Sequence, residues 1–198
     1  MKFLFAVFLL FSINANANEN KDQEDAKLFI ENIGNKIITV AKEKKYSESL
    51  KRQKIIDLVD SSIDPNWISR FVLGKNFKNF NDQQKARFTK LYRDFMIYTY
   101  GPKFKDYNGR KFQVNDISFK NNIYLIKSEF LPKDSDTPIL VDFKVKKNYE
   151  GFQILDFIAE GISLIETQRS EFNSVISEKG IDKFLEDLEV KIKKLKKS

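Results

Sequence analysis

The sequence predicts an α+β fold in which helices pack on a four-stranded antiparallel sheet. Apolar residues recur every three or four positions as far as Tyr100, a spacing typical of amphipathic helices. From Lys111 onward they alternate with polar residues, as in strands. Four such alternating segments follow one another with only turns or a loop between them. This order favours an antiparallel meander over a parallel sheet.

The first 17 residues have the pattern of a secretory signal peptide. A basic start, Met1-Lys2, precedes an apolar run from Phe3 to Ile13, and Ala15-Asn16-Ala17 supplies the small residues of a cleavage site. The apolar run is too short to span a bilayer. We therefore expect cleavage after Ala17 and a mature chain, residues 18–198, that forms one domain. The alternative is an uncleaved N-terminal anchor.

Four helices are expected before the sheet, after a loose polar leader over residues 18–24. Their expected ranges are 25–41, 48–59, 65–73 and, after a cap at residue 81, up to Gly101-Pro102. Asp64 is the expected N-cap of the third helix because Pro65 follows it. Gly74 fits the left-handed C-terminal cap of that helix. Asn81 and Gln84 have the spacing of a capping box.

The four strands are expected over residues 111–119, 123–131, 139–146 and 152–159. Asn121-Asn122 and residues 148–151 are the expected hairpin turns. In the last strand, Ile154 and Ile158 are expected on one side and Phe157 on the other, so both faces should be covered. Two closing helices are expected over residues 163–177 and 181–194, and Ser163 is the expected N-cap of the first.

The composition argues against most enzyme classes. The chain has no histidine and no cysteine, which removes the commonest general base, the thiolate nucleophile, the usual zinc ligands and any disulfide. Its formal net charge of +7 favours anionic membranes or acidic surfaces as partners, or serves solubility. No nucleic-acid-binding motif accompanies this charge, so nucleic acid is not an expected partner.

Asp156 and Glu160 are the carboxylates closest to an acid–base pair. No third group accompanies them, so a structural role is the better interpretation. We expect Asp156 to bond to neighbouring backbone, and Glu160 or Glu166 to pair with Arg169. No catalytic residue and no metal ligand is assigned.

Two stretches of the chain resemble one protein family. The C-terminal stretch has Gly151, Phe152, Asp156, Glu160, Gly161, Ser163, Leu164, Arg169 and Phe172 in the pattern of the family. The upstream stretch has Leu73-Gly74, Phe77, Gln84, Phe88, Phe95 and Tyr100, followed by Phe104 and Tyr107. The sequence thereby resembles the MlaC family of periplasmic phospholipid-binding proteins, also called the toluene-tolerance family. Phe152 departs from the tryptophan that the family often has.

The resemblance implies a curved sheet and helices that enclose a hydrophobic lipid pocket. Part of this fold is allowed to resemble the NTF2 fold. It also implies a phospholipid shuttle in the periplasm that maintains outer-membrane lipid asymmetry. The expected partners are an inner-membrane ABC transporter complex with an MCE-domain subunit and an outer-membrane lipoprotein–porin complex. Phospholipid is the expected cargo, and no cofactor is expected.

Aromatic and aliphatic residues on the predicted helices and strands are the candidate walls of this pocket. They are Trp67, Phe71, Phe88, Phe95, Tyr98, Tyr100, Val141, Phe143, Val145, Ile154, Phe157 and Ile158. By spacing alone such residues are more typical of an ordinary core; the resemblance is what makes them pocket walls. A smaller apolar ligand, or a scaffold that binds nothing, remains an alternative.

Overall fold

The computed structural model describes the backbone of residues 4–100 and 109–197, and the side chains of residues 20–100 and 111–197. Its elements are, in chain order, helices α1 (Leu4–Lys42), α2 (Glu48–Asp60) and α3 (Pro65–Leu73), the 3-10 helix η1 (Gly74–Asn79), helix α4 (Asp82–Tyr100), strands β1 (Gly109–Lys120), β2 (Ile123–Pro132), β3 (Ile139–Asn148), β4 (Gly151–Ala159) and β5 (Ile162–Ser163), and helices α5 (Leu164–Lys179) and α6 (Ile181–Leu195). Phe104 and Tyr107, which match the family pattern in the sequence, lie outside the described residues.

The sheet is antiparallel throughout, with its strands in the order β1-β2-β3-β4-β5. The α+β class and the four-stranded meander are confirmed, and the two-residue strand β5 adds to the expected count. The loops Asn121-Asn122 and Glu160-Gly161 each hold two residues, all with positive φ. Two-residue loops of this conformation match the right-handed twist of the flanking strands. They fix the β1–β2 and β4–β5 registers.

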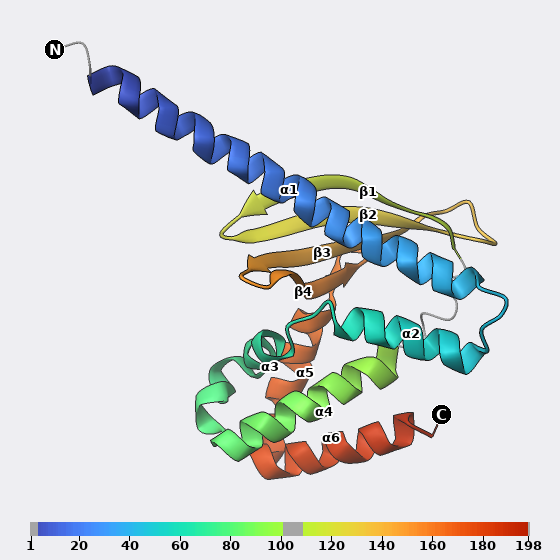
Figure 1. Ribbon diagram of the computed structural model, residues 1–198. Coiled ribbons are helices and arrows are strands. Elements are labelled where there is room, and N and C mark those ends of the chain that lie inside the picture. The colour runs from blue at the N-terminus through green and yellow to red at the C-terminus, as the bar shows by residue number, and fades with distance from the viewer. Residues whose placement is uncertain (1–3, 101–108, 198) are drawn as a thin grey trace.

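Helix α1 lies across one face of the sheet, and the other helices gather beyond the β4 edge (Figure 1). We call the sheet face turned toward α1 the inner face. It carries Phe112, Val114, Ile117, Phe119, Tyr124, Ile126, Ser128, Phe130, Val141, Phe143, Val145, Phe152, Ile154 and Phe157. A β-carbon at Gly34 of α1 would lie 2.3 Å from the ring of Phe112 on β1. The absent side chain therefore lets α1 approach the sheet closely.

A bulge in β4 changes which of its side chains share a face. Val145 pairs with Ile154 and Lys144 pairs with Asp156, so Leu155 is an extra residue on β4. The strict alternation expected for this strand is therefore wrong beyond Leu155. Ile154 and Phe157 both lie on the inner face, and Ile158 lies on the opposite face with Asp156.

We call α3, η1, α4, α5 and α6 the helical lobe. Its centre is a cluster of five aromatic rings from three helices, with neighbouring centroids between 5.2 and 6.3 Å apart. The rings belong to Phe88, Tyr92, Phe95, Phe172 and Phe184. The connection from α2 into the lobe attaches to the sheet: the backbone N–H of Ile154 donates to the carbonyl of Ser62 at 2.7 Å, which protects part of the β4 edge.

The expected N-terminal caps are present, whereas Gly74 ends α3 with a φ of 54° and a ψ of −125°, which is not the expected left-handed helical conformation. Asp64 accepts a hydrogen bond from Trp67 N at the start of α3, and Ser163 accepts one from Glu166 N at the start of α5. Asn81 and Gln84 exchange two hydrogen bonds, of 2.9 and 2.8 Å, which is the reciprocal capping box. These local bonds explain why the helix starts could be predicted from the sequence.

The loose leader expected over residues 18–24 is wrong, because α1 is continuous through it. This segment contains neither glycine nor proline to interrupt a helix. Asp22 also forms an ion pair with Lys147 of β3, which attaches the segment to the sheet. Among the helices in the described parts of the chain, none is long and apolar enough to cross a membrane.

Candidate functional site

The structure distributes the predicted wall residues over separate environments instead of one cavity wall. The largest group lies on the inner face and consists of Val141, Phe143, Val145, Ile154 and Phe157. Phe88 and Phe95 lie in the aromatic centre of the helical lobe. Trp67, Phe71 and Tyr98 line two surface pockets, Tyr100 joins a polar network, and Ile158 lies on the opposite sheet face.

The inner-face group surrounds Phe143, a residue that is only 7% exposed. The ring of Phe112 lies 6.3 Å from it, and the ring of Phe157 lies 5.3 Å from it on the other side. Val141 is two positions away on the same strand and face. We call these four residues the Phe143 cluster. All but Phe143 itself are only partly buried, so apolar surface remains accessible at this end of the sheet.

Phe88 and Phe95 differ from this group because protein atoms already cover them. Phe88 is completely buried, and its ring packs against Phe80, Tyr92, Phe172 and Phe184. Phe95 is 3% exposed and packs against Tyr92 and Phe172. Both residues therefore join α4 to α5 and α6. The sequence pattern showed that they are buried, but not against which elements.

A buried polar network lies beside these rings. The hydroxyl of Tyr92 donates to Oε1 of Gln168, and Nε2 of Gln168 donates to the hydroxyl of Tyr100 at 3.0 Å. Burial, followed by the nearby charges of Tyr100 and Asp156, raises the pKa of Tyr92 well above its ordinary value. Tyr92 is therefore a neutral hydrogen-bond donor. Gln168 lies on the buried face of α5, and nothing in its sequence context predicted a polar partner there.

Asp156 fastens the start of α5 to β4. The residue is 4% exposed, and its carboxylate accepts hydrogen bonds from the hydroxyl of Ser163, at 2.6 Å, and from Ile165 N, at 3.2 Å. Nζ of Lys144 lies 3.2 Å from the same carboxylate and 2.9 Å from Glu166. Burial opposes the charge on Lys144, but these bonds outweigh it and raise the pKa of the lysine. The expected backbone bond of Asp156 is thus present.

The expected pairing of Arg169 with Glu160 or Glu166 is wrong. Glu166 pairs with Lys144, and Oε1 of Glu160 accepts a hydrogen bond from Leu140 N at 2.9 Å. The guanidinium of Arg169 instead lies over the ring of Phe71, 4.8 Å from its centroid. The two carboxylates weighed as an acid–base pair are therefore both used in structural contacts. Among the described residues, no group of three histidine, cysteine or acidic side chains could hold a metal ion.

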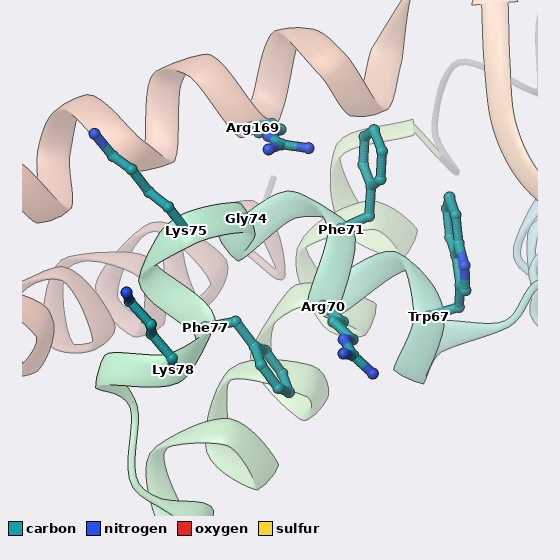
Figure 2. A pocket seen from close by; sticks show the side chains of 8 residues that line it. All are labelled: Trp67, Arg70, Phe71, Gly74, Lys75, Phe77, Lys78 and Arg169. Carbon is teal, nitrogen blue, oxygen red and sulfur yellow. The ribbon is translucent and has the colours of Figure 1, made fainter.

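Two pockets open on the outside of the helices. The first has a volume of about 490 Å³ and lies where α3, η1 and α5 meet, with Trp67 and Phe71 in its wall (Figure 2). The second, of about 470 Å³, lies between α2 and α4 and includes Tyr98. Both are distinct from the Phe143 cluster, which belongs to the sheet.

The fold and the Phe143 cluster together define a class: an α+β domain whose antiparallel sheet presents an incompletely covered apolar face. The family model described as "MlaC protein" matches residues 31–190. The chain therefore belongs to the MlaC family, as its sequence pattern indicated. A solved structure with the same fold is the phospholipid-binding protein from Ralstonia solanacearum in complex with a phospholipid. The two share 18% sequence identity, with a TM-score of 0.76, over 86% of this chain and 98% of that chain.

Proposed function

We propose that this protein binds a phospholipid and holds its acyl chains against the inner face of the sheet, at the Phe143 cluster. The observation that carries the proposal is the partial exposure of Phe112, Val141 and Phe157 around the buried ring of Phe143. Apolar side chains that the protein leaves partly uncovered can be covered by an apolar ligand, and small-molecule sites are lined mainly by such side chains. Membership in the MlaC family and the shared fold with a phospholipid complex support the same ligand.

The energetics suit a carrier that needs no energy source of its own. The chains of a two-tailed phospholipid contain roughly 30 methylene groups, and at about 0.8 kcal/mol each their removal from water is worth about 24 kcal/mol. A bilayer provides nearly the same free energy. Transfer between a membrane complex and an apolar protein site is therefore close to neutral, while release into water is prevented.

In this proposal the protein is a periplasmic shuttle that maintains outer-membrane lipid asymmetry. It moves phospholipid between an inner-membrane ABC transporter complex with an MCE-domain subunit and an outer-membrane lipoprotein–porin complex. Removal of residues 1–17 is compatible with the fold, since the first turns of α1 project beyond the sheet (Figure 1). The described core residues of α1 begin at Ala26. Intact mass of the protein from the periplasmic fraction tests cleavage after Ala17.

We also propose that the protein acts by binding and not by catalysis. The carboxylates best placed for acid–base work, Asp156 and Glu160, hold the start of α5 and the backbone of β3. A substrate would have to break these contacts before either group could react. Incubation with phospholipid, followed by lipid extraction, should return the lipid unchanged; a hydrolysed product would contradict this part of the proposal.

The cargo proposal is tested by native mass spectrometry of protein purified from periplasm without detergent, followed by identification of extracted lipid. We expect a diacyl phospholipid at near-stoichiometric level. Val141→Trp should lower the lipid content, because the larger ring fills space at the Phe143 cluster. Asp142→Trp is the matched control, since Asp142 is the next residue and lies on the opposite face.

Three results would contradict the proposed cargo or the assignment of the Phe143 cluster as its binding site. A bare polypeptide mass that persists after mixing with phospholipid vesicles would indicate a scaffold that binds nothing. A smaller apolar molecule in the extract would replace phospholipid as the ligand. Equal lipid content in folded Val141→Trp and Asp142→Trp variants would place the chains elsewhere.

A further inference from the structure

The outer surface of the helical lobe carries a basic and aromatic pocket that the proposed cargo site does not use. Its volume is about 490 Å³. It is lined by Trp67, Arg70, Phe71, Gly74, Lys75, Phe77, Lys78 and Arg169. The lining thus combines four cations with three aromatic rings and contains no carboxylate. Figure 2 shows these side chains around the turn from α3 into η1, with Arg169 reaching across from α5.

The two arginines are held by rings instead of acids. The guanidinium carbon of Arg169 lies 4.8 Å from the ring centroid of Phe71, and that of Arg70 lies 5.5 Å from the ring centroid of Phe77. A cation–π contact uses the flat face of a guanidinium and leaves its N–H edge free to donate. In the part of the chain that the structure describes, none of the four lining cations forms an ion pair. Their hydrogen-bonding capacity is available to a ligand.

The stack that holds Arg169 is built in advance. Trp67 and Phe71 are stacked, with centroids 5.1 Å apart and ring planes 12° apart, and Figure 2 shows Phe71 between Trp67 and Arg169. Gly74 lies beneath the guanidinium, where a β-carbon would come within 2.9 Å of it. Both the rings and the glycine therefore fix the arginine before any ligand arrives, which lowers the entropic cost of binding.

The chemistry of the pocket fits a phosphate group at a membrane surface. Four of the chain's 35 lysine and arginine residues line this one pocket, and no acidic residue lines it. Such a concentration of one sign attracts anions. The planar fork of arginine and the point charge of lysine are the usual ligands of phosphate oxygens. Tryptophan is enriched where an apolar surface meets water, as at the headgroup level of a bilayer.

We propose that this pocket binds the phosphate of an anionic phospholipid headgroup at a membrane surface. It is a second site, on α3, η1 and α5, and it does not require cargo at the Phe143 cluster. Arg70 and Arg169 bind the phosphate oxygens, Lys75 and Lys78 extend the positive field at the rim, and Trp67 enters the headgroup layer.

Trp67 is the only tryptophan of the chain, so its fluorescence reports on this pocket directly. We expect phosphatidylcholine vesicles that contain phosphatidylglycerol to shift the emission saturably, and pure phosphatidylcholine vesicles to have little effect. Inorganic phosphate and an acidic polypeptide are the comparison probes. An equal response to inorganic phosphate would mean a free-anion site. A response to the acidic polypeptide without one to vesicles would mean a protein partner. Either result would overturn the proposal.

Two pairs of substitutions distinguish specific binding at this pocket from general attraction by the positive charge of the protein. Arg70→Gln with Arg169→Gln should weaken vesicle binding by about tenfold or more, since each basic residue near an anionic surface contributes to attraction. Lys194→Gln with Lys197→Gln removes the same charge from exposed residues at the end of α6 and should weaken it much less. Equal losses in the two pairs would overturn the proposal. Arg70→Gln alone, at an exposed position, provides the test if the double variant does not fold.

The failure of this proposal can be told apart from the failure of the cargo proposal. The Arg70→Gln, Arg169→Gln variant should keep its co-purified lipid in native mass spectrometry. The Val141→Trp variant should keep its vesicle-induced Trp67 signal, provided that the emission of the added tryptophan is subtracted using vesicle-free spectra. Loss of co-purified lipid in the folded arginine variant would overturn the assignment of two separate sites.

Discussion

A β-carbon at Gly74 would lie 2.9 Å from Nη2 of Arg169 and 3.0 Å from the carbon of its guanidinium. Gly74 ends α3 with φ of 54°, and Arg169 belongs to α5. The missing side chain therefore lets a residue of one helix lie across the end of another and reach Phe71. Gly74 and Arg169 belong to the two distant stretches that carry the family resemblance, and the fold brings them into contact.

Gly74→Ala is expected to cost more stability than Gly180→Ala. Both glycines end helices with positive φ, a backbone conformation that alanine rarely adopts, so each alanine costs about 1–3 kcal/mol in backbone strain. The added methyl at residue 180 meets open space, whereas at residue 74 it displaces Arg169 from Phe71. Loss of that contact adds about 1 kcal/mol. Urea unfolding midpoints measure both costs. In an Arg169→Ala background the extra cost at Gly74 should disappear; if it persists, the contact is not its cause.

Gly34→Ala is expected to destabilise the protein although alanine is the better helix former. Alanine gains about 1 kcal/mol over glycine inside a helix, but its β-carbon would lie 2.3 Å from the ring of Phe112. Overpacking of this kind costs about 1–3 kcal/mol. In a Phe112→Ala background the γ- and δ-carbons that the added methyl would meet are gone, and the same substitution should become stabilising. An unchanged sign in the two backgrounds, measured by chemical denaturation, would contradict the close α1–β1 packing.

Asp156→Ala should lower the free energy of unfolding by about 2–3 kcal/mol, because it leaves buried donors at the start of α5 without an acceptor. Asp142→Ala, two residues before Lys144 on the same sheet face, is the control and should change stability by less than about 0.5 kcal/mol. Amide hydrogen exchange should accelerate in the first turn of α5 in the Asp156 variant alone. Equal effects of the two substitutions would contradict the conclusion that Asp156 holds the start of α5 against β4.

Deprotonation of Tyr92 is expected to cause part of the loss of folding stability at alkaline pH. Its pKa in the folded protein is raised by burial above the ordinary value, which is about 10 in an unfolded chain. The proton is thus bound more tightly when the protein is folded. The contribution is complete below pH 10 and is lost as the pH rises beyond it.

Tyr92→Phe should therefore show two changes in urea unfolding between pH 7 and pH 11. At neutral pH it loses the hydrogen bond to Gln168, worth about 1 kcal/mol. Above pH 10 its stability should decline less steeply than that of the unmodified protein. Tyr98→Phe, outside the buried network, should keep the original slope. Parallel declines in all three proteins would exclude Tyr92 as a source of the alkaline loss.

The sequence by itself determined most of the elements and many of their ends, but not η1, β5 or the N-terminal part of α1. Alternation marked four strands, Asn121-Asn122 marked a hairpin turn, and Asp64, Asn81 and Ser163 marked helix starts. Each of these signals depends on bonds between residues a few positions apart, such as the 2.8 Å bond from Gln84 N to Asn81. Such bonds form wherever the chain has that local conformation, so the sequence is sufficient to predict them.

The tertiary structure decided which residues meet. The bulge at Leu155 put Phe157 beside Phe143 and Ile158 on the opposite face, which a strict period of two could not show. Periodicity predicted that Phe88 is buried, but the partners of Phe88 come from other helices. The charge pattern predicted that Arg169 would form an ion pair with a glutamate, whereas in the fold its guanidinium packs over the ring of Phe71. In each case the outcome depends on contacts between segments far apart in the chain. Such contacts contribute free energy only after the whole fold has brought the segments together, so local sequence patterns cannot predict them.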